Sequence, residues 1–106
     1  MPKYLFKASY GPEGVKGVRA KGGTARQAAI AHLAEGLGGS MESFYFAFGE
    51  TDVYTIVDLP DSAAATAVAL TVNSQDGVSI VTVPLIEPAE VDEAAQRSVD
   101  YTPPGG

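Results

Sequence analysis

The sequence contains no cysteine, a single histidine and fewer basic than acidic side chains. The absence of cysteine excludes disulfide bonds, thiolate catalysis and Cys-ligated metals. One histidine, with no His-rich or carboxylate cluster at ligand spacing elsewhere in the chain, does not supply the ligands of a metal site. We therefore expect neither a bound metal nor a cofactor.

Basic residues are also scarce. Seven Lys and Arg against 13 Asp and Glu give a net charge of −6, whereas nucleic acids and anionic membranes attract clustered cations. No stretch approaches the roughly 20 apolar residues of a membrane span. The opening MPKYLFKASY has no apolar run of signal-peptide length. These absences predict a cytoplasmic protein whose partners are neither nucleic acid nor membrane.

Hydrophobic residues make up 45% of the 106 residues, which is enough for one domain with a modest core. We expect this single domain to span residues 1–101. The closing TPPGG, residues 102–106, has the composition of a disordered tail.

The clearest structural signal is a hairpin. Residues 41–48 are rich in aromatic side chains and residues 53–59 in β-branched ones, and both types favour strands. Gly49 and Asp52 bracket a short polar break of the kind that reverses the chain. The pattern predicts two antiparallel strands joined at residues 49–52.

Both hairpin strands are apolar on both of their faces. Met41 and Tyr45 fall on one parity of the first strand, and Phe44 and Phe46 on the other. A strand with one solvated face would alternate between apolar and polar residues. The pattern therefore predicts that both faces of the sheet are covered.

The remaining helices and strands are predicted from the spacing of apolar residues and from Gly, Pro and capping residues that end or begin them. Strands are expected at 3–10 and 78–85, and helices at 13–20, 24–37, 61–72 and from 87 onward. Thr24 and Gln27 have the spacing of a capping box, Gly38 and Gly39 form a C-terminal stop, and Asp61 or Ser62 caps the third helix. The inward stripe of the second helix is expected to be Ala29, Ile30, Leu33 and Leu37. Pro84 predicts that the last strand ends there or lies at an edge.

This order is β-α-β-β-α-β with an added C-terminal helix. It predicts an α+β, ferredoxin-like fold with a four-stranded antiparallel sheet in the order 4-1-3-2 and two helices on one face. The other face is then bare, although its strands are apolar. The simplest cover is the same face of a second copy, which would make a dimeric α+β barrel or a larger even-numbered oligomer. Alternatively, the C-terminal helix folds over that face.

Three segments of the sequence are also similar to those of a known protein family. The opening PKYLFKASYGPEGVKG, the hairpin FYFAFGETDVYTIVDLP and the late VPLIEPAEVDEA resemble the GYD-domain family. These are small bacterial proteins grouped with the dimeric α+β barrels. The family is named for a Gly-Tyr-Asp signature in the hairpin. Gly49 and Asp52 match it here, and Thr51 occupies the tyrosine position. The resemblance implies the fold and the assembly but no settled activity.

Three residues are weak catalytic candidates. His32 could act as a general base near neutral pH, or simply lie on the flank of its helix. Asp52 could anchor a substrate, or hydrogen-bond the backbone of its turn. Lys7 lies in the middle of a central strand, where its ammonium could hold an anion or reach the rim of the sheet.

Four residues are candidates for ligand binding. Tyr4, Tyr45 and Tyr54 lie on strands, where a tyrosine can line a pocket or serve only for packing. Arg26, with Arg19, flanks the Gly22-Gly23 break. An arginine there could clamp a carboxylate or phosphate, or remain solvated. That break is not a phosphate loop, because it lacks the required spacing.

Three functions remain open on these grounds. The first is a homo-oligomeric protein that binds a small molecule between sheet and helices. The second is a cofactor-independent oxygenase or isomerase acting on a small aromatic or polyketide-like compound, which rests on fold analogy alone. The third is a structural or regulatory module that binds other proteins through an exposed edge or through the C-terminal helix. Whether the protein is an enzyme is left undecided.

Overall fold

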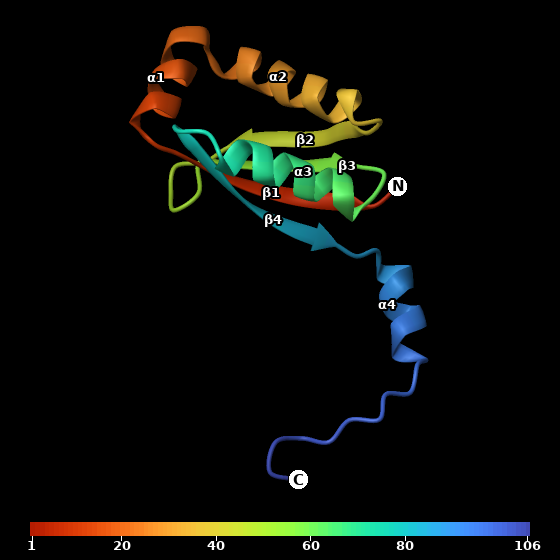
Figure 1. Ribbon diagram of the computed structural model, residues 1–106. Helices are drawn as coiled ribbons and strands as arrows, with labels where there is room; N and C mark the ends of the chain where they lie inside the picture. Colours follow the sequence, from red (N-terminus) through yellow and green to blue (C-terminus); the bar gives the residue numbers. More distant parts are fainter.

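The computed structural model describes all residues from Met1 to Gly106 and shows an α+β architecture (Figure 1). Four strands and four helices follow one another along the chain. They are β1 (Lys3–Tyr10), α1 (Pro12–Lys21), α2 (Gly23–Gly36), β2 (Ser40–Phe46), β3 (Val53–Asp58), α3 (Ser62–Asn73), β4 (Val78–Leu85) and α4 (Pro88–Ala95). Each element expected from the sequence is present, with boundaries shifted by a few residues at most.

The strands form one open antiparallel sheet in the order β2-β3-β1-β4. Read from β4, the series is 4-1-3-2. The edge position of β4 accommodates Pro84, which has no N–H to donate. Helices α2 and α3 lie on the same face of the sheet, with α2 over β2 and α3 over β1 and β4 (Figure 1). The opposite face has no helix on it.

Alternation along β1 decides which side chains form the core. Tyr4, Phe6 and Ala8 are buried beneath the helices, and their cross-strand neighbours on β3 are Val57, Thr55 and Val53 in that order. The helices contribute Ala34, Ala65 and Val68, and the β3–α3 connection contributes Leu59. Only 11 of 106 residues are buried, so the core of a single chain is thin.

The uncovered face of the sheet, called here the bare face, is largely apolar. One row of cross-strand neighbours runs Tyr45, Tyr54, Lys7 and Val81, and the next runs Ser43, Ile56, Leu5 and Val83. Tyr45 is 69% exposed and Val81 60% exposed. A single chain therefore leaves two mainly apolar rows, interrupted by Lys7 and Ser43, wholly or partly open to water.

Lys3, Glu42 and Asp58 form a triad of charged side chains at one end of the bare face. The Lys3 ammonium donates to Glu42 at 2.6 Å and to Asp58 at 2.9 Å. These two hydrogen bonds, that to Glu42 first, raise the pKa of Lys3 above its usual range. The triad links β1, β2 and β3 at their shared end.

The sequence predicts that Met41 and Tyr45 lie on the same face of the sheet, and this is wrong. The β2–β3 register shifts between Met41 and Ser43, because a β-bulge inserts an extra residue there. Met41 consequently packs against the core with the helix-facing residues, whereas Tyr45 stays on the bare face. The aromatic richness of β2 therefore does not place apolar side chains evenly on both faces.

The predicted cap of α2 is also wrong. Gly22, with φ of +88°, is at once the C-cap of α1 and the N-cap of α2, and no side chain caps α2. Since one residue joins the two helices, Thr24 lies inside α2 and has no capping role. The buried stripe likewise centres on Ala34, with Ile30, Leu33 and Leu37 half-buried, and leaves Ala29 exposed.

The predicted starts and stops elsewhere are confirmed. The Asp61 carboxylate accepts a hydrogen bond of 2.9 Å from the Ala64 N–H and caps α3. After α2, the N–H groups of Gly38 and Gly39 donate to the carbonyls of Glu35 and Ala34. With Gly38 at φ +83°, this is a Schellman motif.

The chain beyond β4 leaves the body of the molecule. Helix α4 projects away from the sheet and covers neither of its faces (Figure 1), and every residue from 86 to 106 is exposed. A capping box of Glu87 and Glu90 opens α4. Arg97 lies beyond the end of α4 and pairs with Glu93 at 2.7 Å. The alternative that this helix covers the bare face is therefore wrong.

Candidate functional site

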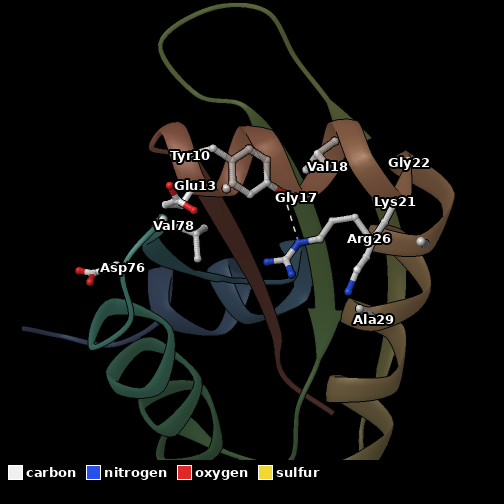
Figure 2. Close-up of a pocket in the computed structure, with 13 residues that line it drawn as sticks. Tyr10, Glu13, Gly17, Val18, Lys21, Gly22, Arg26, Ala29, Asp76 and Val78 are labelled. Carbon is white, nitrogen blue, oxygen red and sulfur yellow. Dashed lines mark hydrogen bonds between the residues drawn. The ribbon is translucent and has the colours of Figure 1, made fainter.

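A hollow of about 320 Å³ lies at the end of the sheet where β1 finishes and β4 begins. Helix α1 and the first half of α2 form two of its walls, and the turn before β4 forms another (Figure 2). Its volume falls at the lower end of the range for ligand pockets, roughly 300–1,000 Å³. The hollow is therefore large enough to hold a small molecule.

Two glycines permit this arrangement. Gly77, at φ +99°, turns the chain into β4, and its carbonyl accepts a 2.9 Å hydrogen bond from the Gly11 N–H. A Cβ on Gly14 would lie 2.2 Å from that same carbonyl oxygen. Only a glycine at position 14 lets α1 approach the turn so closely. The contact anchors α1 at one side of the hollow.

Tyr10 and Arg26 meet inside the hollow. The Arg26 Nε donates to the Tyr10 hydroxyl at 3.3 Å, and the guanidinium carbon lies 5.8 Å from the centre of the Tyr10 ring. Figure 2 shows the Arg26 side chain reaching across the hollow to Tyr10, with Lys21 beside it. No hydrogen bond or ion pair within the chain engages the two terminal nitrogens of Arg26. They are free to bind a ligand.

Acidic side chains lie on the other side of the hollow. Glu13 and Asp76 line the side of the hollow opposite Lys21 and Arg26, with the Asp76 carboxylate directed outward (Figure 2). Glu13 lies 3.7 Å from Lys16, and neither acid pairs with a cation that lines the hollow. The hollow thus has a basic side and an acidic side rather than a uniform charge.

A second, smaller cavity of about 40 Å³ lies between the sheet and the two covering helices. Its walls are almost entirely hydrophobic, with Ile30 and Leu33 from α2 and Val68 and Val72 from α3. A water molecule occupies about 30 Å³, so the cavity has room for a methyl-sized group only. Three residues line both this cavity and the larger hollow, namely Tyr10, Arg26 and Val78.

The family model of the GYD domain matches residues 4–95. This chain belongs to the GYD-domain family. Neither the comparison with curated proteins nor the comparison with solved structures finds a match. Family membership fixes no activity, so the function must be argued from the site itself.

The GYD domain brings only one of its four predicted ligand-binding residues to the hollow. Arg26 lines it. Tyr4 is buried in the core, with its hydroxyl 3.4 Å from the Ser62 Oγ. Tyr45 and Tyr54 face each other across β2 and β3 on the bare face. The tyrosine that does line the hollow is Tyr10, at the end of β1.

The three catalytic candidates do not come together. His32 is exposed on α2, Lys7 lies on the bare face between Tyr54 and Val81, and Asp52 lies in the β2–β3 connection. None of them lines either cavity. The structure also holds no group of three or more His, Asp or Glu side chains placed to bind a metal ion. None of the helices is long and apolar enough to cross a membrane.

Asp52 holds the end of β1 in place. Its backbone N–H donates to the Ala8 carbonyl at 2.8 Å, and its carboxylate accepts from the Tyr10 N–H at 2.7 Å. The side chain thus supplies an acceptor for a strand-end N–H that β3, which begins only at Val53, does not reach. Because Tyr10 in turn accepts from Arg26, Asp52 supports one wall of the hollow from behind.

Replacing Asp52 with alanine is expected to lower the free energy of unfolding by about 1–3 kcal/mol, because the Tyr10 N–H loses its acceptor. Asp52→Asn keeps an oxygen at that place and should lose about half as much. Urea denaturation followed by circular dichroism measures both. Glu50→Ala, which removes an exposed carboxylate from the same connection, is the matched control. Equal stability of Asp52→Ala and Glu50→Ala would show that the hydrogen bond contributes nothing.

Proposed function

We propose that this GYD domain is a homo-oligomeric protein that binds a small molecule in the hollow between α1, α2 and the end of the sheet. The observation that carries the proposal is the hollow of about 320 Å³ in which the terminal nitrogens of Arg26 have no protein partner. The two nitrogens are not buried, so without a ligand they bond water, which the acceptor of a ligand can replace. An arginine held in place by a tyrosine, with free donors aimed into a hollow, is arranged for a ligand.

Self-association is the second half of the proposal. A folded monomer of 10.9 kDa exposes about 5,600 Å², whereas this chain exposes 7323 Å². The projecting C-terminal segment contributes to the excess, because every residue from 86 to 106 is exposed. Covering the bare face with the same face of a second copy would bury the two apolar rows and make a two-fold, dimeric α+β barrel built from ferredoxin-like halves.

A fragment screen on the intact protein tests the binding half. Small molecules of mixed charge and polarity would be screened by ligand-observed NMR, and native mass spectrometry would detect any co-purified ligand. Ala29→Trp places an indole in the hollow, because Ala29 lines it. We expect this variant to lose the bound fragments, with dissociation constants raised at least about tenfold because the hollow is filled.

Ala28→Trp is the matched control for that screen. Ala28 is exposed on the same helix and does not line the hollow, so its replacement should leave binding unchanged. Fragments that bind wild type and both variants equally would lie elsewhere and would contradict the proposed site. A complete absence of binders would contradict small-molecule binding as the function of the hollow.

A further inference from the structure

We infer that the ligand of the hollow is a small monocarboxylic acid with an apolar body, whose carboxylate binds the terminal nitrogens of Arg26. This inference rests on the proposed binding function and names the class of molecule that the hollow recognises. Three features of the hollow support it: the fixed guanidinium, the division of charge between its two sides, and the apolar surface next to the guanidinium.

The guanidinium is fixed in a way that suits a carboxylate. Its Nε is used by the Tyr10 hydroxyl at 3.3 Å, and its carbon lies 5.8 Å from the Tyr10 ring centre. The ring and the hydroxyl therefore orient the plane of the guanidinium. The two terminal nitrogens remain as a pair of parallel donors, and a planar carboxylate accepts from such a pair in the strong bidentate geometry.

The charges around Arg26 limit the ligand to a single negative charge. Lys21 adds one more cation to the basic side of the hollow, but Glu13 and Asp76 line the opposite side. The whole chain also carries a net charge of −6. A phosphate ester or a dicarboxylate would bring a second negative charge toward these acids, and this repulsion, although screened because both acids are exposed, disfavours it. A monocarboxylate can bind beside the two cations without bringing a second negative charge toward the acids.

The body of the ligand has an apolar surface to lie on. Beside Arg26 the hollow is lined by the ring of Tyr10 and the side chains of Val18 and Val78. Tyr10 and Val78 also line the apolar cavity of about 40 Å³ behind them, which has room for a methyl-sized group. An aryl or short alkyl group on the carboxylate would replace water at this surface, and burying apolar area of this kind is favourable.

The test compares matched acids and amides on the full-length protein. Acetate, hexanoate, benzoate and phenylacetate would each be titrated beside the corresponding primary amide, with phenyl phosphate as the dianion, by ligand-observed NMR. We expect hexanoate, benzoate or phenylacetate to bind at least about tenfold more tightly than its amide, because only the acid makes a charge-assisted pair with Arg26. Acetate, which lacks the apolar body, should bind most weakly of the acids.

Arg26→Gln removes the guanidinium and should raise the dissociation constant of the acid by about 10- to 100-fold. This is the range for losing hydrogen bonds to a charged group. The matched control is Arg19→Gln, because Arg19 lies on α1 but does not line the hollow. It should bind as wild type does. Arg26→Lys keeps the charge and loses the paired donors, so an intermediate affinity would confirm the bidentate geometry.

The outcomes separate this inference from the function on which it rests. If fragments bind in the hollow but acids bind no better than amides, or phenyl phosphate binds best, the monocarboxylate is wrong and the binding function stands. The inference is also wrong if Arg26→Gln and Arg19→Gln bind the acids equally well. If no acid and no fragment of any class binds, both the inference and the function are wrong.

Discussion

Replacing Gly39 with alanine is expected to lower the free energy of unfolding by about 3 kcal/mol, near the upper end for a substitution that overfills a packed site. A Cβ at this position would lie 1.9 Å from the Asp58 carbonyl oxygen and 3.2 Å from a methyl group of Leu59. The carbonyl belongs to the backbone of β3, and Leu59 is fully buried, so neither can move aside cheaply. Gly39 also donates to Ala34 in the Schellman motif that ends α2, so a shift of position 39 would loosen that motif as well.

Thermal unfolding at a fixed protein concentration measures this loss. For a domain of this size a change of about 3 kcal/mol corresponds to a Tm lower by roughly 10–20 °C. Gly17→Ala is the matched control, because a Cβ at Gly17 would meet nothing within 4 Å. Since Gly17 lies inside α1, alanine there should stabilise the protein by about 0.5–1 kcal/mol. Similar Tm values for the two variants would contradict the close packing of the α2–β2 turn against β3.

The elements of this fold were predictable from local signals. The alternation of Tyr4, Phe6 and Ala8 with Lys3 and Lys7, broken only by Leu5, predicts a strand without reference to the rest of the chain. The cap of α3 could likewise be predicted, because Asp61 accepts from an N–H only three residues ahead. Signals of this kind depend on neighbours in the sequence, and a single sequence contains them in full.

The errors arose where a distant contact decides the local geometry. The bulge between Met41 and Ser43 is set by pairing with β3. None of the residue types at that point predicts a bulge. Thr24 has the spacing of a capping box, yet Gly22 joins α1 to α2 so tightly that Thr24 falls inside the helix. In both cases tertiary structure overrides a local preference of a few tenths of a kcal/mol to about 1 kcal/mol.

The candidate site was predictable only in part for the same reason. Arg26 could be singled out because it follows the Gly22-Gly23 break, whereas Tyr10 was not among the predicted ligand-binding residues. Their meeting in one hollow depends on the approach of α1 to the turn at Gly77, which joins parts of the chain more than 60 residues apart. Tyr45 and Tyr54 look equally suitable in the sequence. Only the register of the sheet places them on the bare face, away from both cavities.

Replacing Tyr45 with aspartate is expected to convert the proposed dimer into a monomer. Tyr45 is 69% exposed in a single chain and begins the row that continues through Tyr54, Lys7 and Val81. On an isolated chain an aspartate there stays in water, so the fold should lose less than about 0.5 kcal/mol. Between two bare faces it would place two carboxylates, one from each copy, in a contact that is mostly apolar and in which Lys7 is the only cation of the row.

The size of that penalty sets the expected shift in assembly. Burying a poorly paired charge at an interface costs about 2–5 kcal/mol, so the dimer dissociation constant should rise by at least about 30-fold. Light scattering coupled to gel filtration over a dilution series measures it. Leu70→Asp is the matched control, because Leu70 is also 69% exposed but lies on α3, on the opposite side of the sheet. It should remain dimeric. If Leu70→Asp dissociates and Tyr45→Asp does not, two copies meet through their helices. A wild-type protein that is monomeric at every concentration would leave the bare face open to water and remove self-association from the proposed function.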